Sequence, residues 1–192
     1  MIYIVIPTTK ERRPQTDRLL ASIREHTKVE HSVVLYENSD GGWVVALRKV
    51  LAGINGLAFL VGCDCVVHDG WDIALIEGYL KAYPNGEGVV EPYNELHHGK
   101  LCQHPFGHTE VLLQYLDPDF IHNFSDNWMT ERLNEKGLYT YIPESKIEHM
   151  HHVNKKAEMD ETYKTVNASY AKDAETYQRK TREYNDNIKK KL

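Results

Sequence analysis

The sequence has no hydrophobic run long enough to cross a membrane. A bilayer span needs about 20 consecutive apolar residues, and the apolar stretches here, such as Ile2 to Ile6, are much shorter. The first residues also lack the basic segment and the cleavage site of a secretory signal. We therefore expect a soluble, cytoplasmic protein without a membrane span.

Acidic residues outnumber basic ones, and cysteines are few. The chain has 23 Lys and Arg against 28 Asp and Glu, a formal net charge of −5, which gives the whole surface no attraction for nucleic acid. The three cysteines are odd in number, and Cys63 and Cys65 are separated by one residue. This spacing does not suit a secreted disulfide framework, so we expect reduced thiols.

Several motifs of other enzyme classes are absent. There is no Cys-x-x-Cys pair and no His-Glu-x-x-His helix, which argues against a zinc hydrolase or a zinc-binding module. The loop from Thr8 to Pro14 has Lys and Arg but no Gly, unlike the usual loop of nucleotidyltransferases. Histidine, by contrast, is plentiful: eleven occur, and they concentrate at His97, His98, His104, His108 and 149–152. This distribution indicates metal or phosphate chemistry.

The hydrophobic pattern indicates an α/β protein. A chain of 192 residues with 41% hydrophobic content can form one globular domain. Buried strands alternate with helices in its first third, which predicts a mostly parallel central sheet flanked by helices. The expected strands are 2–6, 33–36, 58–62, 88–92 and 139–142, and the expected helices are 16–26, 44–54, 71–79, 110–115 and 126–136. Ligands of such sheets bind beyond the carboxyl ends of the strands.

The composition changes after residue 154. We therefore divide the chain into a domain of residues 1–154 and a C-terminal helical extension of residues 155–192. Tyr163, Tyr170, Tyr177 and Tyr184 recur every seven residues, which predicts one long helix with a tyrosine stripe. The stripe either packs back onto the domain or joins copies of the chain into a homo-oligomer.

The segment around Asp64 resembles a known family. A buried strand ends at Cys63-Asp64-Cys65 and is followed by a short apolar run and by Gly70-Trp71. This order is similar to that in family 2 and related GT-A glycosyltransferases. The resemblance implies a single GT-A (Rossmann-like) domain that transfers a sugar from a nucleotide-diphosphate sugar, with inversion. Asp64 takes the place of the acidic residue that binds the metal, and Cys63 stands where another Asp is common.

The late histidines complete the expected metal site. Departure of a diphosphate needs a cation acting as a Lewis acid, and one carboxylate cannot hold that cation alone. His149 and His151 occupy alternating positions after the last expected strand, where side chains share a face. The family commonly places a C-terminal His on the metal, so the resemblance implies that Asp64, His149 and His151 bind Mn²⁺ or Mg²⁺. An imidazole ligand favours manganese.

A second motif supplies the candidate base. The run Ser125-Asp126 at a helix start resembles the Glu-Asp motif of the family, with Ser125 in place of the usual Glu. Asp126 then matches the general base of inverting members, which draws the proton from an acceptor hydroxyl. The alternative is structural, because Ser125 or Asp126 also suits a helix N-cap.

The remaining site residues contact the donor. By resemblance, Pro7 and Thr8 touch the base, while Glu37 or its neighbour Asp40 contacts base or ribose, since carboxylates accept hydrogen bonds from N–H and hydroxyl groups. Arg12 suits a phosphate contact.

The acceptor stays open between a glycan, a protein, a lipid and, as in phage enzymes working in the host cytoplasm, a modified DNA base. A degenerate protein that binds nucleotide sugars or zinc without turnover is the alternative to an enzyme.

Overall fold

The amino-terminal part of the chain builds the parallel half of a central sheet. The computed structural model describes residues 1–37 and 42–190, so Asp40 lies outside the described residues. The first elements are β1 (Ile2–Thr8), a 3-10 helix at Lys10–Arg12, α1 (Arg13–His26), β2 (His31–Glu37), α2 (Trp43–Leu51) and β3 (Leu57–Leu60). β1 lies between β2 and β3 and pairs in parallel with both. Its continuous apolar run is buried on both faces, as in sheets covered by helices on each side.

The following elements add four more strands to the sheet, two of which run against the others. They are β4 (Cys65–Val67), α3 (Trp71–Ala82), β5 (Val89–Tyr93), β6 (Phe106–His108), α4 (Thr109–Tyr115), α5 (Ser125–Glu135) and β7 (Tyr139–His149). The strand order is β2-β1-β3-β6-β5-β7-β4. Among the described residues three pairings are parallel and three are antiparallel. Among the described strands β4 and β6 run against the other five, so the predicted α/β class with a mostly parallel sheet is confirmed.

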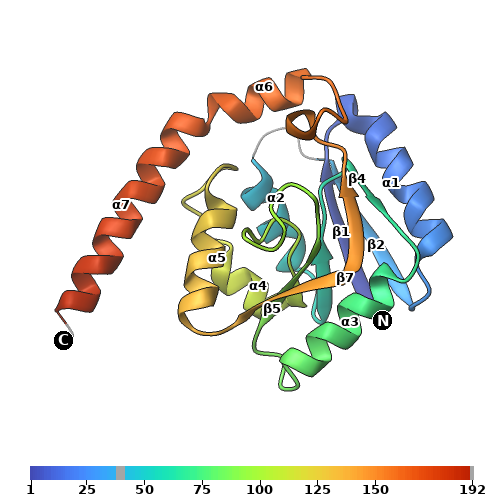
Figure 1. The fold of residues 1–192 in the computed structure, drawn as a ribbon. Helices are drawn as coiled ribbons and strands as arrows, with labels where there is room; N and C mark the ends of the chain where they lie inside the picture. The colour runs from blue at the N-terminus through green and yellow to red at the C-terminus, as the bar shows by residue number, and fades with distance from the viewer. Residues whose placement is uncertain (38–41, 191–192) are drawn as a thin grey trace.

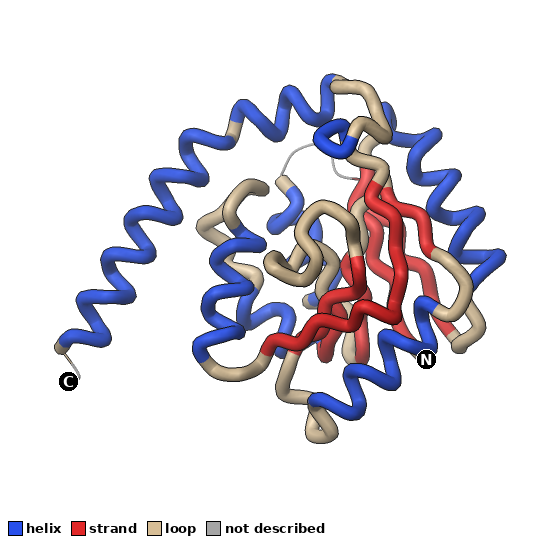
Figure 2. Tube along the Cα trace, viewed as in Figure 1, coloured by secondary structure: helices blue, strands red, loops and turns tan. Residues whose placement is uncertain are grey.

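Helices cover both faces of this sheet, as Figures 1 and 2 show. On one face α1 and α3 contribute Leu19, Ile23, Trp71 and Tyr79 to a core cluster with β1. On the other face α2, α4 and α5 contribute a second cluster, which includes Leu47, Leu51, Leu112, Met129 and Leu133. Because both faces are filled by packed apolar side chains, the polar residues of the site are confined to the edge where the strands end.

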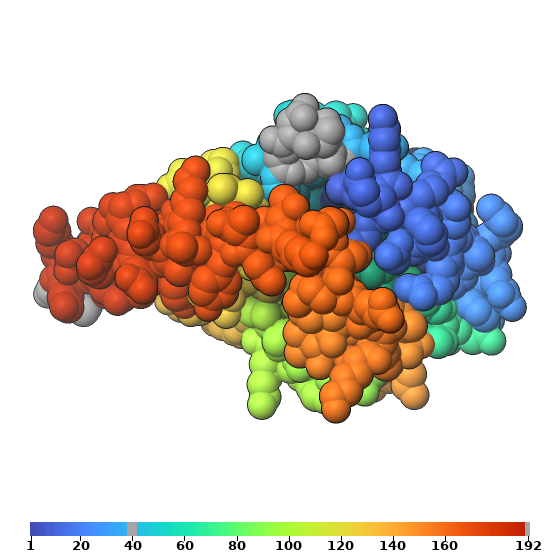
Figure 3. Space-filling view, turned by 90° about the horizontal axis from the view of Figure 1, so that it is seen from above, coloured from blue at the N-terminus to red at the C-terminus, as the bar shows by residue number. Residues whose placement is uncertain are grey.

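The C-terminal extension forms two helices where one was predicted. α6 (Glu161–Ala168) and α7 (Tyr170–Lys189) are separated at Ser169, and a short 3-10 helix at His152–Asn154 precedes them. The two helices arch over the domain from the carboxyl edge of the sheet towards α5 (Figures 1 and 3). Among the described residues no helix combines the length and the apolar character that a bilayer crossing requires.

The tyrosine stripe faces the domain. Tyr170 and Tyr177 pack their rings against Phe124, and Arg132 lies 3.8 Å from the ring centroid of Tyr184. Tyr163 reaches Asp64 through its hydroxyl. The predicted packing of the stripe onto the domain is therefore confirmed, whereas the homo-oligomer stays a prediction.

A buried aspartate fastens α7 to the loop before α5. The Asp173 carboxylate is fully buried and accepts hydrogen bonds from the backbone N–H groups of residues 121, 122 and 123, at 2.9, 3.0 and 2.9 Å. The Ser169 hydroxyl donates a further bond at 3.2 Å. The Asp173 carboxylate is thus the hydrogen-bond acceptor for all of these donors, and the three backbone N–H groups have no other partner among the described residues.

We expect Asp173→Ala to loosen this attachment strongly. Leaving buried donors without an acceptor should lower the free energy of unfolding by about 3 kcal/mol. Chemical denaturation measures the change, and Asp186→Ala on the exposed side of the same helix is the matched control. Equal stability of the two variants would show that Asp173 does not hold α7.

Candidate active site

The carboxyl ends of the first three strands meet at one edge of the sheet. Thr8 lies opposite Glu37 in the β1–β2 register, and the backbone N–H of Val61, just after β3, donates to Val5 of β1. This alignment places Pro7, Thr8 and Glu37 on the edge to which the loop carrying Asp64 belongs. Glu37 is exposed there and lies 3.9 Å from the Lys10 amine.

Asp64 is the centre of the polar contacts at this edge. It is 7% exposed and lies in the loop between β3 and β4. Its Oδ2 accepts hydrogen bonds from Arg12 at 3.1 Å and from the Tyr163 hydroxyl at 2.8 Å. Its Oδ1 lies 3.4 Å from Nε2 of His149. Burial alone disfavours the charged carboxylate, but His149 and Arg12 outweigh burial and hold the pKa of Asp64 well below its usual range.

Arg12 links Asp64 to the C-terminal extension. Arg12 is 3% exposed, and its guanidinium pairs with Asp64 at 3.1 Å and with Asp160 at 2.9 Å. The guanidinium also lies 4.0 Å from the ring centroid of Tyr163. Asp160 also caps α6 by accepting from the Tyr163 N–H. The predicted phosphate contact of Arg12 is thus replaced here by two carboxylates. Asp160 and Tyr163 belong to the site although the sequence analysis did not assign them to it.

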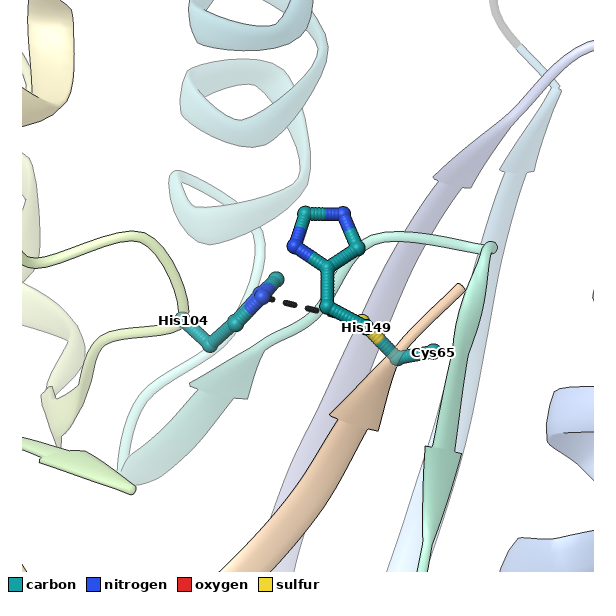
Figure 4. Close-up of side chains that lie close together, drawn as sticks. All are labelled: Cys65, His104 and His149. Atoms are coloured by element: carbon teal, nitrogen blue, oxygen red, sulfur yellow. Dashed lines mark hydrogen bonds between the residues drawn. The ribbon is translucent and has the colours of Figure 1, made fainter. Parts of the chain in front are cut away.

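The pairing of β4 with β7 creates a cluster of potential metal ligands. Cys65 lies directly opposite His149 in this antiparallel pair, so their side chains share a face. His104, from the segment before β6, brings Nε2 to 3.6 Å from the Cys65 sulfur. One ligand atom of each residue lies within 4.8 Å of those of the other two, and all three residues are buried (Figure 4). The sequence placed His104 in a histidine-rich stretch but gave no sign of this contact.

His151 lies beyond the end of β7, which differs from the prediction that it shares a strand face with His149. The two rings are nevertheless neighbours, with centroids 5.0 Å apart, and the His151 ring is also 4.7 Å from that of Tyr163. Its Nδ1 accepts a hydrogen bond from Val153. Burial, with the nearby His149, lowers the pKa of His151 to about 4, so the ring is neutral at pH 7. Its single nitrogen lone pair accepts the bond from Val153 here, so a cation bound by His151 has to displace that bond.

Asp126 lies in the first turn of α5. The residue at the N-cap position is Phe124, with a left-handed backbone, and no side chain caps the helix. The N-cap interpretation of Ser125 and Asp126 is therefore wrong: the Ser125 hydroxyl donates to the carbonyl of His122 instead. Burial raises the pKa of Asp126 to about 6, although a hydrogen bond from the Asn127 N–H opposes the rise. A carboxyl group of this kind can accept a proton near neutral pH.

Comparisons with known proteins extend only to structure. No protein-family model matches the chain, and no curated protein matches it in sequence. Glucosyl-3-phosphoglycerate synthase from Mycobacterium tuberculosis, solved with Mn²⁺, UDP and phosphoglyceric acid, is similar with a TM-score of 0.51 and 13% identity. The match covers 73% of this chain and 66% of that one, so the chain spans slightly less than two thirds of its length.

A second solved structure is a glycosyltransferase involved in the glycosylation of the major capsid of PBCV-1. It has a TM-score of 0.49 and 10% identity over 78% of this chain and 94% of that one. The likeness to the mycobacterial synthase shows the fold, and with it the predicted GT-A-like architecture is confirmed.

Proposed function

We propose that this chain is a metal-dependent glycosyltransferase that moves a sugar from a nucleotide-diphosphate sugar to an acceptor hydroxyl, with inversion. The observation that carries the proposal is Asp64, a buried carboxylate beside an imidazole at the ligand-binding edge of a GT-A-like sheet. The mycobacterial synthase of the same fold was solved with Mn²⁺ and UDP, which supports a cation and a nucleotide as ligands here.

The proposed cation is Mn²⁺ or Mg²⁺, held by Asp64 with His149 and His151 as the candidate imidazole ligands. Two ligand atoms bound to one ion at about 2.1 Å lie about 3 Å apart, and the Asp64 oxygen and the His149 nitrogen are 3.4 Å apart. The donor set therefore fits a small divalent ion. When bound, such an ion stabilises the negative charge of the leaving diphosphate.

Other residues of the edge would bind the donor. We propose that Pro7 and Thr8 contact the base and that Glu37, or Asp40 in its place, contacts the base or ribose. When the donor binds, Arg12 would exchange one of its two carboxylate partners for a phosphate of the donor. Its planar guanidinium binds carboxylate and phosphate in the same forked manner. Donor binding would then release Tyr163 and Asp160 from their contacts with the Asp64–Arg12 pair.

This release gives the C-terminal extension a part in the reaction. Asp160 and Tyr163 lie in the proposed extension of residues 155–192, whereas Asp64 and Arg12 lie in the proposed domain of residues 1–154. The two parts therefore share one site. The acceptor, whether glycan, protein, lipid or modified nucleic acid, has to reach the sugar beside this segment.

The proposed base predicts a specific pH dependence. Asp126 accepts a proton only as a carboxylate, so kcat/KM should fall as pH drops through its pKa of about 6. Asp126→Asn should lower kcat by about 10² to 10⁴-fold and remove this acidic limb. A pH–rate profile measures both effects, with Asp186→Asn as control. An unchanged acidic limb in Asp126→Asn would exclude Asp126 as the base.

A screen of nucleotide sugars tests the proposed function itself. Thermal unfolding is followed with each donor, with and without Mn²⁺, because a ligand of the folded state raises the unfolding temperature. We expect one donor class to stabilise the chain only with Mn²⁺, and the same donor to release nucleoside diphosphate. Stabilisation without release under any acceptor condition would identify a degenerate binding protein, and no stabilisation by any donor would reject the proposal.

A further inference from the structure

Cys65, His104 and His149 form a buried cluster that the proposed sugar transfer does not use as a set. Their exposed fractions are 0%, 3% and 8%, and they come from β4, the segment before β6 and the last residue of β7. Three segments distant in sequence thus bring one sulfur and two imidazoles together (Figure 4). A thiolate with imidazoles is the ligand chemistry that zinc prefers over magnesium or manganese.

The separations suit a tetrahedral zinc ion. With bonds of about 2.3 Å to sulfur and about 2.0 Å to nitrogen, two ligand atoms of a tetrahedral site lie about 3.5 Å apart. The Cys65 sulfur and His104 Nε2 are 3.6 Å apart, and all three ligand atoms lie within 4.8 Å of one another. A small movement of the His149 side chain would bring its nitrogen to the separation that a tetrahedral site requires.

One histidine of the cluster also has unmet bonding capacity. Nδ1 of His149 is buried and has no hydrogen-bond partner among the described residues. Buried polar atoms are nearly always paired, so this atom points to a ligand that binds nitrogen. The S–H···N bond between Cys65 and Nε2 of His104 does not satisfy it.

We propose that Cys65, His104 and Nδ1 of His149 bind a zinc ion, with a solvent or protein atom as the fourth ligand. This site is separate from the cation proposed for the nucleotide and takes His149 out of that cation's two candidate imidazoles, leaving Asp64 and His151. Zinc binding does not depend on sugar transfer. The other ring nitrogen of His149, Nε2, then carries the proton and donates to Asp64 at 3.4 Å. Such a carboxylate partner fixes the tautomer of a metal-bound histidine.

The zinc site therefore orients Asp64. With His149 occupied on both nitrogens, His151 is the imidazole that remains for the nucleotide's cation. The Cys65 thiolate favours zinc, whereas the oxygen ligands on the Asp64 side of the site favour Mn²⁺ or Mg²⁺. Zinc would act here as a structural ion that joins β4, β7 and the segment carrying His104.

Metal analysis of the full chain, with any affinity tag removed, tests this proposal. The protein is loaded with ZnSO₄, passed through gel filtration and analysed for zinc by mass spectrometry; a second sample is loaded with Co²⁺ and examined by absorption spectroscopy. We expect about one zinc per chain, and for cobalt a tetrahedral spectrum with a thiolate charge-transfer band. Cys65→Ser should remove that band and lower zinc retention at least tenfold, and His104→Gln should lower retention similarly.

The control is Cys102→Ser, which removes a buried thiol outside the cluster and should keep both zinc and the cobalt spectrum. Circular dichroism verifies that each variant is folded. No zinc in the wild-type chain, a cobalt spectrum without the thiolate band, or loss of zinc in Cys102→Ser would each overturn the proposal. If the chain retains zinc but transfers sugar from no donor, only the proposed function is rejected. If it transfers sugar but retains no zinc, only the proposed zinc site is rejected.

Discussion

Asp64→Asn is expected to abolish sugar transfer. Asparagine keeps the size of the side chain and can still accept hydrogen bonds from Arg12 and Tyr163, but it loses the negative charge that a divalent cation requires. If the cation supplies several kcal/mol of transition-state stabilisation, its loss lowers kcat by at least about 10³-fold. Release of nucleoside diphosphate in the presence of Mn²⁺ measures the effect.

The control for this substitution is Asp69→Asn. Asp69 follows in the same region but is exposed, and it pairs with His26 rather than with the site. An exposed pair of this kind contributes little, so this variant should keep its activity and stability. Activity of Asp64→Asn within a few-fold of the wild type would remove Asp64 from the reaction.

Arg12→Met is expected to cause the largest loss of stability. Methionine fills much of the same volume, but it leaves the buried Asp64 carboxylate without its cation and Asp160 without its ion pair. Removing one partner of a buried ion pair typically costs about 3 to 5 kcal/mol, because the other charge stays buried and unpaired. Urea denaturation, followed by circular dichroism, measures the free energy of unfolding.

A double substitution separates the ion pair from simple packing. In Arg12→Met/Asp64→Asn no unpaired carboxylate remains at position 64, so the double variant should be more stable than Arg12→Met alone. Arg13→Met is the matched control, since Arg13 is exposed and pairs only with Asp17 across one helical turn. Strict additivity of the two single effects would show that Arg12 and Asp64 do not stabilise each other.

The order of the longer elements was predictable because their apolar residues form continuous runs or repeat at helical spacing. β1, β2, β3 and β5 and the helices α1 to α5 all appear close to their expected positions. Thr8 and Glu37 lie opposite each other at the ends of β1 and β2, which is the common edge that parallel strands share. His149 ends β7 opposite Cys65, the residue after Asp64.

Short strands explain most of what the sequence did not indicate. β4 and β6 have three residues each, too few for an alternation of polar and apolar residues to be recognised. Their pairings bring Cys65 to His149 and set the place of His104, so the cluster of these three residues follows from tertiary contacts alone. The charged residues and the proline at position 143 likewise concealed that β7 runs from Tyr139 to His149.

The partners of the C-terminal tyrosines could not be inferred from their period. A seven-residue repeat shows that Tyr163 and its successors share one helix face, but it does not say what that face contacts. Tyr163 and Asp64 are 99 positions apart, and Arg12 and Asp160 are 148 apart. Contacts of this range depend on where the extension crosses the domain, and the helix break at Ser169 helps to set that course.

The most direct test of the nucleotide's cation site is an Mn²⁺ titration followed by electron paramagnetic resonance. The signal of free Mn²⁺ is measured with wild type and with Asp64→Asn, each loaded with zinc, in the presence and absence of UDP and of the other nucleoside diphosphates. We expect the wild type to remove Mn²⁺ from solution much more strongly with one of these nucleotides than without it, and Asp64→Asn to lose this difference. Equal nucleotide-dependent Mn²⁺ binding by both proteins would contradict the assignment of Asp64 as the ligand on which donor binding depends.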